Sequence, residues 1–269
     1  MPIPSISIVV PALNEAENLR FVLPNIPADV HEVILVDGHS HDDTIRVAQQ
    51  LRPDIKIVMQ DGRGKGAALR SGFAAATGDI IVMLDADAST DPAEIPAFVD
   101  ALVAGADFAK GSRFLPGGGT VDMPFHRRLG NGGFVLLVRL LFGARYTDLC
   151  YGYNAFWRYA LPALALDGDG FEIETMMNVR AMRSGLVITE VPSFESKRQY
   201  GAGRLRTIPD GWRVLRTILR ERARSWPRWS PDVGGAGVPI RIQPAELVAV
   251  PVEVAQQERT GGASRPAKL

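Results

Sequence analysis

The chain has 269 residues, 46% of them hydrophobic, and its 30 basic and 30 acidic side chains cancel. This composition allows a folded domain with a sizeable core, and zero net charge gives no overall attraction to nucleic acid, which is not expected as a partner. A single cysteine, Cys150, excludes an intrachain disulfide and fits a reducing compartment.

The first part of the chain alternates strand patterns with helix patterns. Continuous apolar runs predict strands at 6–10, 33–36, 55–59 and 80–84. The predicted helices run through Phe21 and Leu23 and over 42–51, 66–76 and 95–103. Apolar strands that alternate with helices indicate an α/β fold, with a mainly parallel sheet covered by helices on both faces.

Beyond residue 107 the pattern is less regular. A glycine-rich loop over 111–119 contains Arg113, and residues 187–191 are typical of a strand. Three helices are predicted at 125–142, 171–183 and 208–222, and the last carries many arginines. From residue 230 Pro, Gly, Ala and Gln dominate without periodicity. We therefore expect one domain over residues 1–229, with basic C-terminal helices, and a disordered tail over 230–269.

Polar residues follow each of the four strands predicted in the first part of the chain. They are Asn14 and Glu15, then residues 37–43, then residues 62–66, and finally Asp85 and Asp87. In a parallel sheet the carboxyl ends of the strands lie at one edge, and ligands bind beyond that edge. The convergence of four polar segments predicts a ligand site there.

The pair Asp85 and Asp87 is the most informative of these signals. Both carboxylates come directly after the apolar run 80–84, where unpaired charges would be costly to desolvate and would repel each other. A hard divalent ion such as Mg²⁺ or Mn²⁺ takes oxygen ligands and keeps phosphate oxygens as further ligands. The pair therefore predicts a metal site that holds a nucleotide diphosphate.

The loop 62–66 and Asp37 add weaker signals for a nucleotide. The glycines of the loop would let backbone N–H groups and Lys65 approach a phosphate at a helix N-terminus. The loop is not a Walker loop, because its glycine spacing differs and no Ser or Thr follows the lysine. Asp37 ends a strand as the ribose-binding acid of a dinucleotide fold does, but the first strand leads into Pro11 without a glycine fingerprint. This argues against an NAD enzyme.

Several segments together resemble family 2 glycosyltransferases of the GT-A fold. They are Val9–Glu15, Val36–Thr44, Gly64–Leu69 and Asp85–Asp87. The dolichol-phosphate or polyprenyl-phosphate mannosyltransferase-like branch is the nearer resemblance. It rests on Gly111–Arg113, on Arg127 with Asn131, on Asp148 with Tyr151–Tyr153, and on Glu190–Pro192 followed by Arg198 and Gly201. The resemblance covers roughly residues 5–225.

This resemblance implies an inverting transfer of a sugar from a GDP- or UDP-linked donor, with Mg²⁺ or Mn²⁺ as cofactor. The donor would be held by Pro11, Ala12, Asn14, Glu15, Asp37, Gly38, Ser40, Lys65, Asp85 and Ala86, and the metal by Asp85 and Asp87. Arg113 and Arg127 would line the acceptor pocket, and Arg198 would contact a phosphate. Polyprenyl phosphate is the acceptor that the branch implies, and a soluble hydroxyl acceptor is the alternative.

The nature of the acceptor decides whether a general base is needed. A phosphate is already ionised, so arginines can position it for in-line attack. A hydroxyl would require a base. Asp148 is the first candidate and Glu174 the second, with a turn cap and a solvated helix face as their structural alternatives.

Two other functions compete with sugar transfer. A sugar nucleotidyltransferase would carry a glycine-rich activation loop after the first strand, whereas this chain has Pro-Ala-Leu-Asn at 11–14. A degenerate nucleotide-sugar binding protein would not need Asp85, Asp87, Arg113 and Arg198 intact. Both stay open as alternatives to sugar transfer.

The segment from Ser196 to Trp229 differs from the rest of the chain in its charge. Ten cationic residues face only Asp210 and Glu221, which leaves a local charge of +8, and Trp212 and Trp226 lie among them. Basic helices with interleaved tryptophan suit an anionic lipid surface. The helix 125–142 is a second candidate for the same surface, and the alternative for both is packing against the catalytic domain.

No membrane span or signal peptide is predicted. The most apolar segment, 134–142, is too short to cross a bilayer and contains Arg139. The first residues lack the basic and apolar regions of a signal peptide. We therefore expect a cytoplasmic protein, held peripherally at the inner face of the cell membrane if its acceptor is a lipid.

Overall fold

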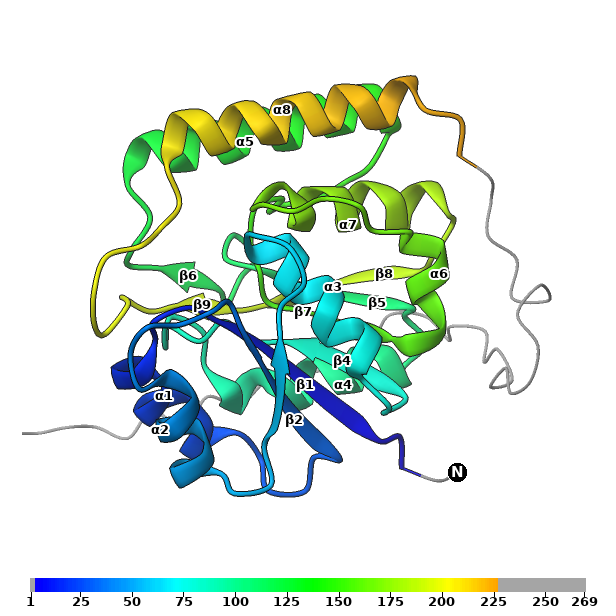
Figure 1. The fold of residues 1–269 in the computed structure, drawn as a ribbon. Helices are drawn as coiled ribbons and strands as arrows, with labels where there is room; N and C mark the ends of the chain where they lie inside the picture. The colour runs from blue at the N-terminus through cyan, green and yellow to red at the C-terminus, as the bar shows by residue number, and fades with distance from the viewer. Residues whose placement is uncertain (1–2, 227–269) are drawn as a thin grey trace, which may run out of the picture.

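The computed structural model describes residues 3–226, which are built around a seven-stranded sheet (Figure 1). The strand order is β3-β2-β1-β4-β7-β5-β8. The strands are β1 (Ile6–Ala12), β2 (Glu32–Asp37), β3 (Lys56–Met59), β4 (Ile80–Met83), β5 (Phe108–Ser112), β7 (Asn154–Trp157) and β8 (Ile188–Pro192). All pairings are parallel except those of β7, which is antiparallel to β4 and β5. The α/β fold with a mainly parallel sheet is confirmed.

Helices cover both faces of this sheet, as the sequence predicts. One face is packed by α1 (Ala16–Val22), α2 (Thr44–Leu51) and α4 (Ile95–Val103), and the other by α3 (Lys65–Ala75), α6 (Leu161–Leu164) and α7 (Glu172–Arg183). Successive residues of β1 alternate between the two cores, with Ile8 and Val10 in one and Val9 in the other. A strand that is buried on both faces must be apolar throughout, which explains its unbroken hydrophobic run.

The strands β5 and β7 are absent from the sequence-based prediction. Both contain a buried polar residue that breaks the apolar pattern. In β5, Lys110 is fully buried and its ammonium donates to the carbonyl of Gly111 at 2.8 Å; in β7, Asn154 is fully buried and its amide donates to the carbonyl of Tyr151 at 3.4 Å. These hydrogen bonds offset part of the cost of burying the two polar residues, although Asn154 Oδ1 has no partner, and the periodicity indicates neither strand.

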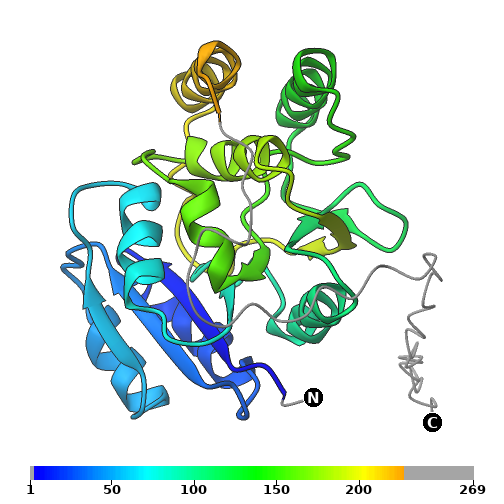
Figure 2. The same ribbon diagram turned by 90° about the vertical axis from the view of Figure 1, so that its right-hand side faces the viewer.

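Two long helices form a further layer above α7. They are α5 (Phe125–Phe142) and α8 (Thr207–Ala223), which lie side by side (Figures 1 and 2). A third core, with Val138 from α5, Val179 from α7 and Ile218 from α8, joins them to the rest of the protein. A small sheet is formed by β6 (Gly119–Thr120) and β9 (Phe194–Glu195). In the chain, β6 precedes α5 and β9 precedes α8. Within residues 3–226, none of the helices has the length and apolarity that crossing a bilayer requires.

The predicted boundaries of the helices hold to within a few residues, and 125–142 is reproduced at both ends. The tail predicted over 230–269, together with residues 227–229 of the predicted domain, lies outside the described residues. The domain boundary at residue 229 stays a prediction.

Candidate active site

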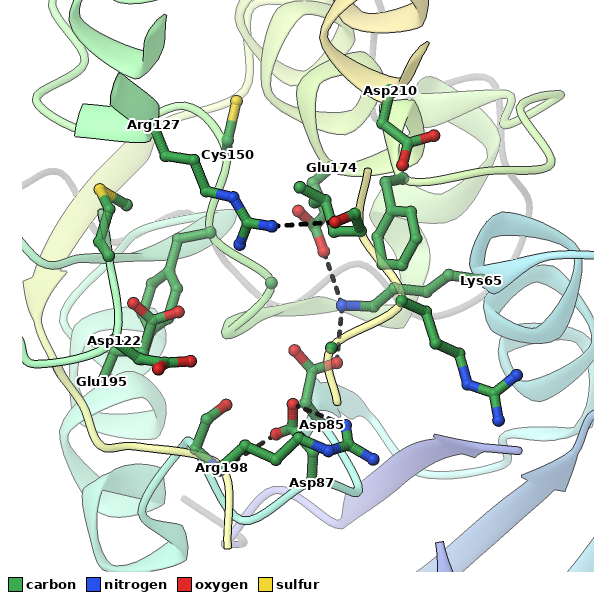
Figure 3. Close-up of a pocket in the computed structure, with 18 of the residues that line it drawn as sticks. Lys65, Asp85, Asp87, Asp122, Arg127, Cys150, Glu174, Glu195, Arg198 and Asp210 are labelled. Carbon is green, nitrogen blue, oxygen red and sulfur yellow. Dashed lines mark hydrogen bonds and ion pairs between the residues drawn. The ribbon is translucent and has the colours of Figure 1, made fainter. Parts of the chain in front are cut away.

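A cavity of about 450 Å³ lies at the carboxyl ends of β1 and β4, and α5 and α8 contribute to its wall. Most of the predicted site residues line it, although they come from segments far apart in the sequence (Figure 3). The lining includes Pro11, Ala12, Glu15, Lys65, Asp85, Ala86, Asp87, Arg113, Arg127, Glu174 and Arg198. The other predicted residues, Asn14, Asp37, Gly38, Ser40 and Asp148, are not among the residues that line it.

Asp85 faces a lysine on the cavity floor. The Lys65 ammonium lies 2.6 Å from Asp85 Oδ1 and 2.7 Å from Glu174 Oε1, so it joins the end of β4 to α7 (Figure 3). Burial raises the pKa of Asp85, Lys65 lowers it, and Asp87 and Glu174 raise it further, which leaves it at about 6. Burial opposes the charge of Lys65, but the two carboxylates outweigh it and raise the pKa of the ammonium.

Asp87 faces an arginine from the segment after β9. The Arg198 guanidinium lies 3.3 Å from Asp87 Oδ2 and also binds the carboxylate of Glu15 at the start of α1. Burial opposes the charge on Arg198, whereas Glu15 and Asp87 raise the pKa of its guanidinium. Each of the two strand-end aspartates therefore has one internal cation as its partner.

Asp37 has an unsatisfied oxygen. Its Oδ2 accepts from the backbone N–H of Ser40 at 2.8 Å, while its Oδ1 is buried without a hydrogen-bond partner. Asn14 holds the same loop, because its N–H donates to Ser40 Oγ at 2.9 Å and its Oδ1 accepts from the N–H of His41 at 2.8 Å. A buried carboxylate oxygen without a donor fits a ligand that brings hydroxyl or N–H groups.

Gly38 leaves room beside Asp37. A Cβ on this residue would lie 3.0 Å from Gln60 Oε1 and 3.3 Å from the carbonyl of Ala12. Gln60 itself lines the cavity. A larger side chain at this position would therefore crowd the corner, and glycine keeps it open.

Arg113 is fixed by a buried ion-pair network. Its Nε lies 2.7 Å from Asp148 Oδ2, and its Nη1 lies 3.0 Å from Glu195 Oε2. Burial raises the pKa of Asp148, but Lys110 and Arg113 outweigh that effect and hold it below its usual range. Because Asp148 is fully buried and does not reach the cavity, this geometry favours a role in holding Arg113 over the role of general base.

Arg127 joins the beginning of α5 to the segment that leads into α8. Its Nη2 donates to the carbonyl of Leu205 at 2.9 Å. One turn later, Asn131 Oδ1 accepts from the N–H groups of Leu149 and Cys150, both at 3.1 Å. The helix thus positions Arg127 on the cavity wall while Asn131 holds the loop that contains Asp148.

At the end of the loop 62–66, backbone N–H groups at the start of α3 already have acceptors within the protein. The N–H groups of Gly66 and Ala67 donate to the carbonyl of Asp169, at 2.8 and 3.3 Å. They are therefore occupied in this structure, and a phosphate would meet Lys65 and Gly64, which line the cavity. The predicted approach of a phosphate to free backbone amides does not match this arrangement.

Several cavity residues are missing from the sequence-based prediction. Asp122 and Glu195 extend into the cavity close to each other, opposite Lys65 and Glu174 (Figure 3). Gln60 and Arg204 also line the cavity. None of them stands in a local pattern that indicates chemistry: Glu195 belongs to a two-residue strand and Arg204 to an irregular segment. For Gln60 and Asp122 the signal is their place just after the ends of β3 and β6.

The carboxylates at the cavity floor fit a divalent cation. Asp85 and Asp87 retain side-chain exposures of 26% and 27%, and both line the cavity. No group of three or more His, Cys, Asp or Glu residues with metal-site geometry occurs among residues 3–226. Two carboxylates suit an ion that keeps water and phosphate oxygens as its remaining ligands, which is the usual behaviour of Mg²⁺.

Comparison with known proteins identifies the family of this chain. The family described as glycosyl transferase family 2 matches residues 7–164. Polyprenol monophosphomannose synthase of Mycolicibacterium smegmatis is 32% identical over 212 residues, covering 74% of this chain and 80% of that protein. Undecaprenyl-phosphate mannosyltransferase of Micrococcus luteus is also 32% identical, over 73% of this chain and 86% of that protein. Dolichol-phosphate mannosyltransferase of Pyrococcus furiosus is 30% identical, but the match covers 59% of its length.

Solved structures give the same fold. Glucosyl-3-phosphoglycerate synthase of Mycobacterium tuberculosis, crystallised with Mn²⁺, UDP and glucosyl-3-phosphoglycerate, has a TM-score of 0.65 and 26% identity. The match covers 83% of this chain and 81% of that chain. The GT-A fold that the sequence predicts is therefore confirmed, and this chain belongs to glycosyl transferase family 2.

Proposed function

We propose that this glycosyltransferase moves a hexose, with inversion, from a GDP- or UDP-linked donor to the phosphate of a polyprenyl phosphate at a membrane surface. The observation that carries the proposal is the composition of one cavity. It combines the metal-type carboxylates Asp85 and Asp87 with the guanidinium groups of Arg113, Arg127 and Arg198. The three mannosyltransferase relatives support a lipid phosphate as the acceptor.

On the donor side, Asp85 and Asp87 would hold Mg²⁺ or Mn²⁺. The bound ion would offset the negative charge that develops on the departing diphosphate. Asp37 would accept hydrogen bonds from the ribose or base through its unsatisfied Oδ1, in the space that Gly38 leaves open. Pro11, Ala12, Asn14, Glu15, Ser40, Lys65 and Ala86 would complete the donor site. Arg198, beside Asp87, would contact a phosphate.

On the acceptor side, the arginines would position an ionised phosphate. Arg127 lies on the cavity wall, and Arg113 is pre-oriented by Asp148 and Glu195. Each nitrogen of the Arg113 guanidinium already has an acceptor, so a phosphate would bind it in place of Glu195 at Nη1. Because the acceptor is already charged, no general base is required, and Glu174 would act through its ion pair with Lys65.

The outer surface of α5 and α8 is suited to anionic lipid. Exposed apolar side chains recur along both helices, at Leu129, Leu136 and Leu140 of α5 and at Ile208, Trp212 and Leu219 of α8. Exposed arginines lie beside them, at 128, 139, 216 and 222, and Arg220 is exposed but pairs with Asp167 at 3.3 Å. Several arginines of the basic segment are instead used internally: Arg198 binds Glu15, Arg213 binds Asp210, and Arg224 binds Asp167. Arg228 and Trp229 lie outside the described residues.

A transfer assay tests the proposed reaction. The purified protein is incubated with Mn²⁺ and a panel of radiolabelled GDP- and UDP-hexoses, with undecaprenyl phosphate or a soluble phosphorylated hydroxyl acceptor. Label in the lipid fraction, released by mild acid as expected for a glycosyl phosphate, supports the proposal. Transfer to the soluble acceptor alone would overturn the lipid acceptor and leave the family assignment intact.

A sedimentation assay tests the proposed surface. The protein should sediment with phosphatidylglycerol vesicles at low salt and be released as salt rises. The double variant Trp212→Ser/Leu219→Ser should bind more weakly, whereas Val103→Ser, which removes an exposed apolar side chain from α4, should bind like the wild type. Equal binding of both variants would exclude α8 from the contact.

The cavity also supports a second candidate, transfer to a soluble phosphorylated compound. Asp122 and Glu195 could act as a base toward a hydroxyl, and the structural neighbour from Mycobacterium tuberculosis is a glucosyl-3-phosphoglycerate synthase. In that case Glu195→Gln would abolish transfer to the soluble acceptor in the assay above.

A further inference from the structure

Lys65 pairs with Asp85, one of the two carboxylates proposed to bind a metal ion. Its ammonium is 2.6 Å from Asp85 Oδ1, closer than Arg198 is to Asp87, at 3.3 Å. The side chain of Lys65 is 14% exposed and that of Glu174 is 7% exposed, so the pair is largely screened from water. A divalent cation bound by Asp85 would need the carboxylate that already pairs with this ammonium.

The backbone around Lys65 fits closely against it. A Cβ on Gly152 would lie 2.7 Å from the Lys65 ammonium, 2.7 Å from Glu174 Oε1 and 3.0 Å from Asp85 Oδ2. Only glycine leaves space for this arrangement of charges. The ion pair is thus built into the packing of three segments, α3, α7 and the turn that contains Gly152.

This cluster carries more negative than positive charge, and a divalent cation would balance the excess. Four carboxylates, those of Glu15, Asp85, Asp87 and Glu174, surround the two cations Lys65 and Arg198. Two negative charges remain uncompensated. The cluster therefore attracts a divalent cation, while Lys65 holds one of its two strand-end ligands.

We propose that Lys65 competes with the divalent cation for Asp85 and makes tight metal binding depend on the nucleoside diphosphate. This inference rests on the proposed metal site at Asp85 and Asp87. Lys65 lines the cavity, so phosphate oxygens that enter it offer the ammonium a new anionic partner. Lys65 keeps Glu174 as its second partner, at 2.7 Å, and releases Asp85 to the metal.

Metal titrations on the Lys65→Met variant test this competition. Mn²⁺ binding is measured by the loss of the electron paramagnetic resonance signal of free Mn²⁺, first with Mn²⁺ alone and then with GDP or UDP. Without nucleotide, Lys65→Met should bind Mn²⁺ about tenfold more tightly or better, the effect of removing a close charge partner. The factor by which the nucleotide improves Mn²⁺ binding should fall accordingly. If Mn²⁺ bound weakly only because the protein offers too few ligands, Lys65→Met would bind it no more tightly than the wild type.

Three further measurements separate this competition from a general change in charge or stability. Arg70→Met removes a positive charge from the same helix, but one that pairs with Asp169, so its nucleotide-free affinity should stay at the wild-type value. Lys65→Arg, which keeps the charge, should bind Mn²⁺ alone as weakly as the wild type. Mn²⁺ alone should raise the Tm of Lys65→Met more than that of the wild type, because binding stabilises the folded state.

The Glu174→Gln variant keeps the test independent of how well Lys65→Met folds. It leaves Lys65 with Asp85 as its carboxylate partner in the cluster, so Mn²⁺ alone should bind more weakly than to the wild type. Tighter binding by Glu174→Gln, or unchanged binding by folded Lys65→Met, would overturn the competition. If Mn²⁺ fails to bind the wild type even with GDP or UDP, the metal site of the proposed function fails as well.

Discussion

The proposed donor side and the proposed acceptor side of the cavity differ in how far their charged side chains are buried. On the donor side, Asp85 and Asp87 are each about a quarter exposed and are held by cations from other segments. On the acceptor side, Asp148 is fully buried and the side chain of Arg113 is 5% exposed. A ligand can therefore replace the partners of the donor carboxylates, whereas the partner of Arg113 is part of the core. The two carboxylates proposed to bind the metal stay partly open to water, whereas Asp148, which fixes Arg113, is buried.

This contrast predicts the largest loss of stability on the acceptor side. Asp148→Ala leaves Arg113 buried with only Glu195 as a carboxylate partner, and breaking such a pair costs about 3–5 kcal/mol. We expect a reduction of that size in the free energy of unfolding measured with urea. Asp87→Ala should cost much less, because its carboxylate is part exposed. Equal losses in the two variants would remove the distinction between the two sides.

The same contrast predicts the largest loss of activity on the donor side. Asp87→Ala should lower the rate of sugar transfer by about 10²–10³-fold, the loss typical of one group that stabilises transition-state charge. Circular dichroism should show an unchanged fold. A variant that keeps full activity, or a wild type that stays active in EDTA, would show that the reaction does not use a metal at this position.

A smaller effect is expected for nucleotide binding at Asp37. Its buried Oδ1 has no partner in the protein, so a bound nucleoside that supplies one should lose about 1–3 kcal/mol of affinity in Asp37→Ala. Calorimetry with GDP and UDP measures this loss. The stability of the nucleotide-free variant should change less than the affinity, and the reverse result would make Asp37 a structural residue.

The smallest effect concerns pH and a carboxylate far from the cavity. Burial raises the pKa of Glu32, but hydrogen bonds from Ser7 and Thr77 outweigh it and lower the pKa from 4.5 to about 2. A lowered folded-state pKa gives stability that is present above pH 4.5 and lost as the pH falls toward about 2. Glu32→Gln should flatten the acid side of the stability curve in that window. A curve that keeps its slope would assign the acid sensitivity to other groups, Asp148 among them.

The sequence predicts those strands, helices and site residues whose pattern lies within a single segment. The apolar runs of β1, β2 and β4 indicate strands buried on both faces, and the positions of Asp37, Asp85 and Asp87 at their ends follow from the chain itself. The helix 125–142 can also be predicted from its own segment, because its apolar residues recur at helical spacing. The resemblance to family 2 glycosyltransferases also rests on such short segments and is confirmed.

The tertiary structure decides which charges meet, because pairing depends on how distant segments pack. Lys65 and Glu174 are 109 residues apart, and Arg113 and Glu195 are 82 apart, yet each pair forms an ion pair. The buried strands β5 and β7 contain Lys110 and Asn154, and each of these side chains donates to a backbone carbonyl that only the folded chain brings within reach. Periodicity records which side of an element is apolar, but the satisfaction of a buried charge is a property of the assembled core.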